Sequence, residues 1–111
     1  MAKLDEYREK VQQILIKYSQ YKPSYGEVEI EQIFDTERGR YQIVSVGWNK
    51  QTRIYGCMMH LDIKDGKIWI QQNTTEVDIA NELLEMGVPK SDIVIGFHTP
   101  KMRQLSGFGV A

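Results

Sequence analysis

Three charged residues form the pattern in this sequence that comes nearest to a catalytic site. Asp35 is followed, after one further strand and its turns, by the triplet Asp62-Ile63-Lys64. Some nucleases use a carboxylate and then a carboxylate-x-lysine triplet, in which the two acids bind Mg²⁺ and the lysine steadies the attacking water. Side chains alternate along a strand, so Asp62 and Lys64 would share one side. The triplet is short and runs directly into a turn, which favours solvated charges at a strand end and keeps a metal-dependent nuclease as the alternative.

The cysteine and the two histidines offer a second kind of chemistry. A metal site needs three or four converging ligands, whereas Cys57 and His60 point to opposite sides of a regular strand. His98 ends an apolar run and directly precedes Thr99-Pro100, which favours a structural hydrogen bond; a small-molecule pocket around His98 is the alternative. The sequence has no nucleophile elbow, no glycine-rich phosphate loop and no basic run. We therefore expect no catalytic residues, no metal and no cofactor.

The segment IWIQQNTTE, residues 68–76, places a tryptophan in a row of amides. If the strand is regular, Ile68 and Ile70 face the core, and Trp69 shares the other side with Gln71 and Asn73. We expect Lys67 to lie on that side too, with Arg53 and Tyr55 on the neighbouring strand. Tryptophan, tyrosine and arginine are enriched in binding hot spots, so this row is a candidate interface centre. The alternative is a two-sided core in which the C-terminal segment buries Trp69.

The first half of the chain predicts a helix followed by a meander of strands. Apolar residues at three- and four-residue spacing predict an amphipathic helix over residues 4–18 that ends before Pro23. From Glu27 the period becomes two, with three glutamates on one side of the first strand. The predicted strands are 27–35, 41–48, 53–64 and 67–73. Asp65-Gly66 is the signal for a two-residue type I′ turn, because both positions need a positive φ.

The second half predicts two further helical segments around a short strand. Thr74 or Thr75 is the expected N-cap of a helix of about three turns that runs to Met86, and Gly87 stops it. Residues 92–97 form a short apolar strand or buried extended segment. Thr99 is the expected N-cap of a helical turn through residue 105. The apolar chain end predicts a docked tail.

Composition places the chain among ordinary globular proteins. It has 111 residues, 41% of them hydrophobic and 26% charged, which fits one domain over residues 1–111. The formal net charge is -1, so no overall field favours nucleic acid or anionic lipid. No segment has the roughly 20 apolar residues of a membrane span or the apolar run of a signal peptide, and we expect a cytoplasmic protein. The predicted fold class is α+β: an antiparallel β-meander of four strands plus a short fifth strand, packed against an N-terminal helix and a second helix, with a short C-terminal helical turn.

The C-terminal half resembles a known family. The run DGKIWIQQNTTEVDIANELLEMGVPKSDIVIGFHTPKMRQLSGFGVA, from Asp65 onward, is similar to the XisI family, the fdxN element excision controlling factors of cyanobacteria. The N-terminal helix and the strand pair around residues 44–48 also match. The resemblance implies a small α+β protein that takes part in excising a DNA element during heterocyst development, with a site-specific recombinase and a companion, XisH, whose fold is of the restriction-nuclease type. It implies no catalytic residues.

These observations together predict a non-enzymatic accessory factor. We expect it to bind an XisH-like protein and to form a homo-oligomer, with a dimer favoured, and to reach DNA only through partners, because phosphate binding needs clustered lysine and arginine. The open side of the sheet and the C-terminal segment are the expected binding surfaces. The predicted partner-binding or oligomer-interface residues are Trp48, Trp69, Gln71, Asn73, His98, Arg103 and Phe108.

Overall fold

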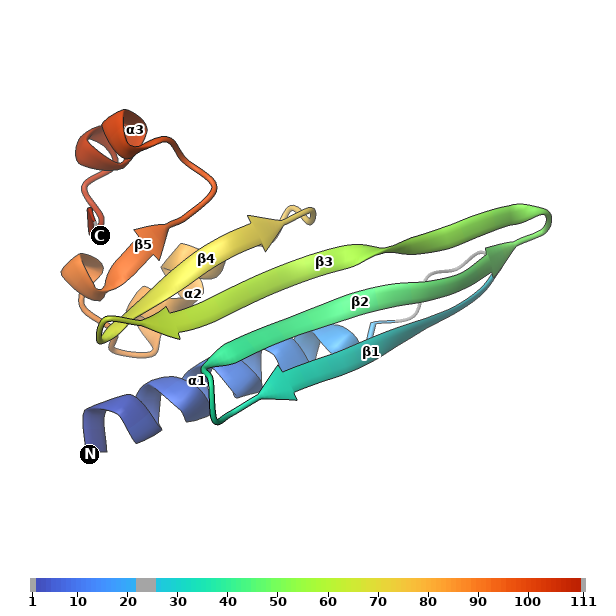
Figure 1. The fold of residues 1–111 in the computed structure, drawn as a ribbon, viewed down its shortest axis with the longest axis horizontal. Coiled ribbons are helices and arrows are strands. Elements are labelled where there is room, and N and C mark those ends of the chain that lie inside the picture. Colours follow the sequence, from blue (N-terminus) through green and yellow to red (C-terminus); the bar gives the residue numbers. More distant parts are fainter. Residues whose placement is uncertain (1, 22–25, 111) are drawn as a thin grey trace.

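The structure is a computed structural model that describes residues 2–21 and 26–110 (Figure 1). Within these ranges, helices flank a five-stranded sheet with the strand order β1-β2-β3-β4-β5. The elements are α1 (Ala2–Ser19), β1 (Glu27–Asp35), β2 (Arg40–Asn49), β3 (Thr52–Lys64), β4 (Lys67–Asn73), α2 (Ile79–Glu85), a 3₁₀ turn η1 (Lys90–Asp92), β5 (Ile93–Ile95) and α3 (Pro100–Leu105). The α+β class, the four-stranded meander, the short fifth strand and the helices are confirmed.

Helix α1 forms because its apolar residues fall on one face. Tyr7, Val11, Ile14 and Leu15 recur at helical spacing and are buried against the sheet. The residues between them are mostly charged or amide side chains that face solvent. Pro23, the expected stop signal, lies outside the described residues.

The meander follows the predicted turns. Asp65 and Gly66 have φ values of 55° and 74°, so both central positions of the β3–β4 turn are left-handed, as a type I′ hairpin requires. This turn pairs β4, which has 7 residues, with only the C-terminal half of β3, which has 13. The N-terminal half of β3 therefore runs on beside β2 without β4 on its other side.

Two register shifts interrupt the strands. Between the pairs Ile43–Met59 and Val44–Cys57, β3 contains one extra residue. Between Leu61 and His60, the pairing with β4 skips Gln71. A bulge of this kind changes which side every later residue faces. The simple alternation used for the sequence therefore fails beyond these two points.

Helix α2 begins later than predicted. Asp78 is the N-cap, and its carboxylate accepts a hydrogen bond from the backbone N–H of Asn81 at 3.0 Å. The predicted cap Thr75 instead closes a turn: its hydroxyl accepts from the N–H of Val77 at 3.1 Å and donates to Asn73 Oδ1 at 2.6 Å. Because this turn occupies residues 73–77, the helix has about two turns rather than three.

The C-terminal segment docks against β4. Strand β5 is parallel to β4, since α2 carries the chain back along the sheet before β5 begins. Thr99 caps α3 as predicted and accepts from the N–H of Met102 at 3.2 Å. The predicted docked tail is confirmed: the N–H of Gly109 donates to the carbonyl of Ile93 at 2.7 Å.

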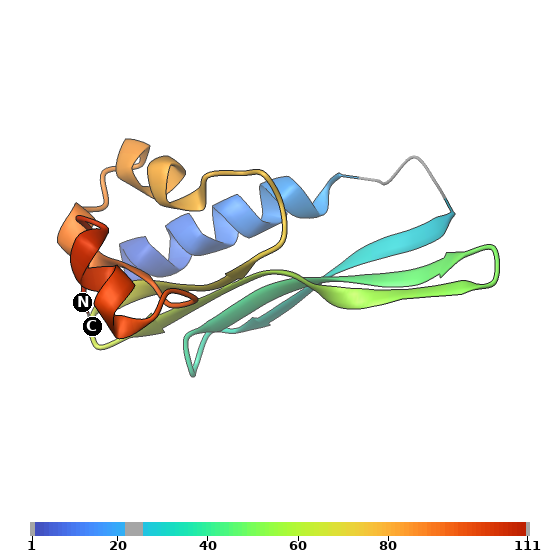
Figure 2. The ribbon, with the colours of Figure 1, turned by 90° about the horizontal axis from the view of Figure 1, so that it is seen from above.

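Helices α1 and α2 lie on the same side of the sheet (Figure 2). The buried core fills the space between them and includes Tyr41, Ile43, Leu61, Ile68 and Ile70 from the strands. We call the other side of the sheet the open face. Among the described residues, no helix has the length and apolar character needed to cross a membrane.

Candidate interaction surfaces

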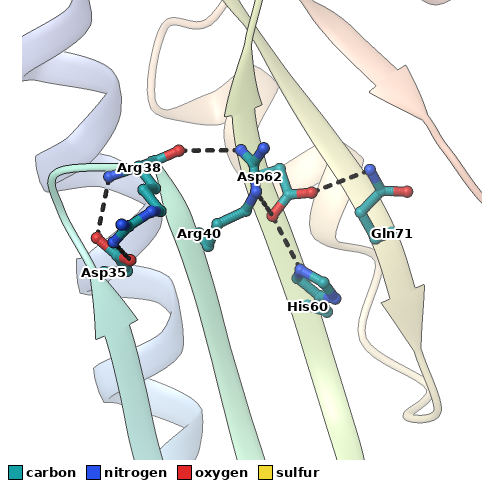
Figure 3. Close-up of polar contacts among 6 residues, drawn as sticks. All are labelled: Asp35, Arg38, Arg40, His60, Asp62 and Gln71. Carbon is teal, nitrogen blue, oxygen red and sulfur yellow. Dashed lines mark hydrogen bonds and ion pairs between the residues drawn. The ribbon is translucent and has the colours of Figure 1, made fainter.

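Asp62 is the centre of a polar cluster on the open face (Figure 3). Its carboxylate accepts from Gln71 Nε2 at 3.1 Å, lies 2.8 Å from His60 Nε2 and lies 3.9 Å from Arg40 Nε. The residue is only 7% exposed, so the prediction of a solvated strand end is wrong for Asp62. Strands on both sides of β3 place Arg40 and Trp69 directly beside it, and together they cover it.

Each of the three residues of the nuclease alternative contacts other residues of the same chain. Asp35 and Asp62 lie in one cross-strand row, but Arg40 lies between them (Figure 3). The backbone N–H of Arg38, followed by its guanidinium, holds the pKa of the Asp35 carboxyl below its ordinary value. Lys64 Nζ lies 4.5 Å from the centre of the Trp69 ring. Over residues 2–21 and 26–110, no three acidic, cysteine or histidine side chains lie close enough to hold a metal.

Cys57 and His60 lie on the same side of β3, contrary to the prediction. The bulge at Met58 turns Cys57 toward the open face, where His60 also lies. The thiol is half-buried and contacts the carbonyl of Met59 at 3.4 Å, and burial raises the pKa of Cys57. A raised pKa keeps the thiol protonated and makes it a poor nucleophile and metal ligand.

Trp69 is buried, with 7% of its surface exposed, which decides between the two interpretations of the amide row. Two cations lie over its ring: Lys64 on β3, and Arg103 on α3, whose guanidinium carbon is 5.2 Å from the ring centre. Arg103 also donates from Nη2 to the carbonyl of Gly96 at 3.1 Å. The C-terminal segment thus covers Trp69, as the alternative interpretation stated.

The predicted neighbours of Trp69 lie elsewhere. Trp69 pairs with Asp62, whereas Arg53 and Tyr55 lie at the far end of β3, beyond the reach of β4. Arg53 lies instead over Trp48, with its guanidinium carbon 5.3 Å from that ring. The short β4 is the physical reason, since its hairpin anchors it to the other half of β3.

Gln71 and Asn73 do not form the expected row. Gln71 stays on the open face and donates to Asp62, but the bulge turns Asn73 to the helix side, opposite the buried Met59. Asn73 Nδ2 donates to the carbonyl of Val77 at 2.6 Å, and its Oδ1 accepts from the N–H of Thr75 at 2.9 Å. These contacts shape the loop before α2.

The remaining predicted residues belong to the C-terminal segment and are half-buried. His98 packs edge-on against Phe97, with the ring centres 5.0 Å apart. Its Nδ1 is buried without a hydrogen-bond partner among the described residues. Phe108 packs on the core and lies under the Lys90 ammonium, 5.3 Å from its ring centre. Phe108 therefore helps to hold the segment in place.

The segment exposes four large apolar residues, which together we call the C-terminal surface. It consists of Phe97, Met102, Leu105 and Val110, each at least half exposed. Met102 and Leu105 are three residues apart on α3, so they are neighbours on one face of that helix. None of the residues of α3 is buried. On the side of the helix that faces the strands, Arg103 donates its hydrogen bond to the carbonyl of Gly96.

A second apolar area lies at the far end of the open face. We call residues 27–31, 44–49 and 52–57 the distal ribbon, because these parts of β1, β2 and β3 extend beyond α1 (Figure 1). Trp48 is 50% exposed and Tyr55 is 72% exposed. Trp48 is therefore the one predicted interface residue that is half exposed or more.

Sequence reasoning missed the roles of His60 and Arg40. A signal for the first was available: His60 and Asp62 are two residues apart in a predicted strand, so they share a face and can form a hydrogen bond. Arg40 required the register of β2 against β3, which pairs it with Asp62. That register could not be read from either strand alone.

Comparisons with known proteins agree on one family. The family model described as XisI protein matches residues 1–110. A XisI-like protein from Anabaena variabilis is 49% identical, with a TM-score of 0.92 over 97% of this chain and 99% of that one. The fdxN element excision controlling factor XisI from the same organism is 35% identical, with a TM-score of 0.85 over 98% of this chain and 99% of that one. A search of curated proteins found no match.

Proposed function

Because the chain belongs to the XisI protein family, we propose that it is a non-catalytic accessory factor in the control of DNA-element excision. The name of one solved relative, an excision controlling factor, supports the process. The engagement of Asp35 by Arg38 and of Asp62 by His60 and Gln71 supports a role without catalysis, because a metal-dependent nuclease needs carboxylates that are free to bind Mg²⁺.

The factor acts through an XisH-like protein of nuclease-type fold, and that protein makes the DNA contact. The net charge of -1 supports this division of labour, since a chain that neutralises phosphates needs clustered cations. On the open face of β1 the side chains are acidic: Glu27, Glu29 and Glu31 point outward there. Phosphate would be repelled from this area.

The partner binds the C-terminal surface. The observation that carries this assignment is the exposure of helix α3. The helix buries no residue, and the apolar side chains of Met102 and Leu105 are 50% and 75% exposed. Exposed apolar neighbours of this kind mark protein contacts. Trp69 and Arg103, predicted as contact residues, act from beneath by holding α3 against β4.

Co-purification with a co-expressed XisH-like protein tests this assignment. We expect the two proteins to elute together in a one-to-one ratio. The double variant Met102→Glu/Leu105→Glu should lower the affinity at least about ten-fold, because two apolar contacts are replaced by charges that must lose their water.

The matched control is Lys101→Glu on the same short helix, where the side chain is also exposed. It changes charge without removing an apolar contact, so it should keep most of the affinity. Absence of any complex with the wild-type chain, or Mg²⁺-dependent DNA cleavage by the chain alone that disappears in Asp62→Ala, would refute the proposed function.

A further inference from the structure

We propose that the open face of the distal ribbon packs against the same surface of a second copy of this chain, about a twofold axis parallel to β2. This self-association uses other residues than the C-terminal surface and does not depend on the XisH-like partner. The inference rests on the exposure of the ribbon, on its aromatic side chains and on the arrangement of its charges.

The distal ribbon has no helix on its open face and extends past α1 on the other (Figure 2). The buried core takes Tyr41 and Ile43 from β2 and Met59 and Leu61 from β3. The ribbon contributes little: Ile30 packs against this core while partly buried, and Val44, 5% exposed, is the one buried residue of the ribbon. The radius of gyration is 14.7 Å, against about 13 Å expected for a compact chain of this length. Strands without a covering layer gain little stability of their own, so an additional layer is expected over the ribbon.

The open face of the ribbon already has the composition of an interface centre. Trp48 and Tyr55 are the large exposed side chains, and Val46 lies between them in the pairing of β2 with β3. The Arg53 guanidinium lies over both rings, 5.3 Å from Trp48 and 6.0 Å from Tyr55. Stacking restricts the arginine, so less freedom is lost when its outer side meets a second surface.

Charges of opposite sign lie on the two sides of this aromatic centre. The pairing of the strands forms a row in which Trp48 has Glu27 on one side and Arg53 on the other. The next row has Val46 between Glu29 and Tyr55. Among the described residues, neither Glu27 nor Glu29 forms an ion pair, and Glu27 and Arg53 are two strands apart.

A twofold axis along β2 makes this surface complementary to itself. The rotation places β1 of one copy over β3 of the other, while the two β2 strands face each other. Glu27 then meets Arg53 of the second copy, and Glu29 meets the hydroxyl of the second Tyr55. The two Trp48 side chains pack at the centre. The strands of the two sheets run nearly parallel, which is the aligned geometry of sheet sandwiches.

Pairing through the edge of β1 does not offer the same complementarity. An antiparallel contact between two β1 strands centred on Glu31 would set Glu27 opposite Asp35 of the second copy. Like charges directly opposite each other destabilise a strand pair. The acidic side of β1 thus disfavours edge pairing. It favours the face-to-face contact, in which Arg53 of the second copy meets Glu27.

A charge exchange tests the proposal by sedimentation velocity, with concentrations from about 1 to about 500 µM to cover the affinities of small interfaces. The wild-type chain should dimerise. Glu27→Arg and Arg53→Glu each place like charges across both symmetric contacts and should weaken the dimer roughly ten-fold. An equimolar mixture of the two variants restores both attractive pairs and should dimerise within about three-fold of the wild type.

Each outcome decides the question. Recovery in the mixture requires that both variants are folded and supports the twofold face contact. A wild-type chain that stays monomeric over the whole range, single variants that dimerise as well as the wild type, or a mixture that is no better than its components would overturn it. Trp48→Ala provides a second measure and should weaken the dimer more than either charge variant. Failure here would leave binding of the XisH-like protein at the C-terminal surface unaffected.

Discussion

At the scale of single residues, Asp92 ties the first helix to the C-terminal half of the chain. Its carboxylate accepts a hydrogen bond from the Tyr7 hydroxyl and lies 2.9 Å from Lys3 Nζ, both on α1. Burial alone would raise the pKa of Asp92, but the bonds from Tyr7 and Lys3 outweigh it and hold that pKa below the ordinary 3.8. For Tyr7, burial and then the bond to Asp92 raise the pKa of the hydroxyl above its ordinary 10.0.

The Asp92 contact predicts a specific dependence of stability on pH. A lowered pKa in the folded state contributes stability that is complete above about pH 4 and is lost as the pH falls through the folded value. The raised pKa of Tyr7 contributes below about pH 10 and loses its contribution as the pH rises above that. Asp92→Asn should lower the free energy of unfolding by about 1–2 kcal/mol near pH 7.

Urea denaturation of the wild type and of Asp92→Asn between about pH 3 and pH 7 measures this difference. The gap between the two proteins should narrow below about pH 4. Glu37→Gln, an exposed carboxylate in the β1–β2 turn, is the control and should match the wild type. A gap that stays constant down to about pH 3 would contradict the role of the Asp92 charge.

The same scale shows what residue identity can and cannot predict. Trp69 was recognised as unusual from its type and position, but its burial depended on α3, whose cation reaches it from 34 residues further along the chain. Asp62 looked like a solvated charge because the turn follows it closely, and the flanking strands bury it instead. Residues distant in the sequence therefore determine the burial of both Trp69 and Asp62, and a local sequence pattern carries no information about them.

At the scale of elements, hairpin turns and caps were predictable because their signals are local. Asp65-Gly66 and Thr99 act as their residue types require, and β4 has the predicted bounds. The two bulges at Met58 and Gln71 were not predictable, since they arise from how neighbouring strands are paired. Each bulge reversed the side of a candidate residue, Cys57 in one case and Asn73 in the other.

Two glycines provide a test of turn geometry without steric clash. A Cβ built on Gly66 or on Gly56 meets no atom within 4 Å, but only Gly66 has a positive φ, 74°. Gly66→Ala should therefore lower the free energy of unfolding by about 1 kcal/mol, because alanine is strained in the left-handed backbone conformation. Gly56→Ala should be neutral or stabilise by up to about 1 kcal/mol, because alanine restricts the unfolded chain.

Chemical denaturation of the two variants beside the wild type makes the comparison. Since neither new methyl group clashes, a difference between them reports the φ requirement of the β3–β4 turn. Equal free energies of unfolding for Gly66→Ala and Gly56→Ala would show that the turn does not need glycine at its second central position. The pairing of β4, and with it the cover over Asp62, depends on this turn.

At the scale of the whole molecule, the two proposed contacts lie on separate surfaces. The extents of 44 × 31 × 24 Å reflect the distal ribbon at one end, while the C-terminal surface lies at the other (Figure 1). Two contacts at opposite ends can be made at the same time. A dimer through the ribbons would hold two C-terminal surfaces apart and offer one to each of two partner molecules.

The net charge of -1 leads to a prediction for DNA. Non-specific affinity comes from phosphates neutralised by clustered cations, and the chain has 14 basic against 15 acidic residues. We expect no band shift with the chain alone at about 150 mM salt, and a shift in the presence of the XisH-like protein. A dimer would not change this result, because it adds a second acidic row rather than a basic one.

The control is the XisH-like protein alone, and fluorescence anisotropy against salt concentration quantifies the DNA binding of both proteins. If the chain alone bound DNA with an affinity that falls steeply as salt rises, it would itself carry a phosphate-binding surface, and the assignment of DNA contact to the partner would be wrong.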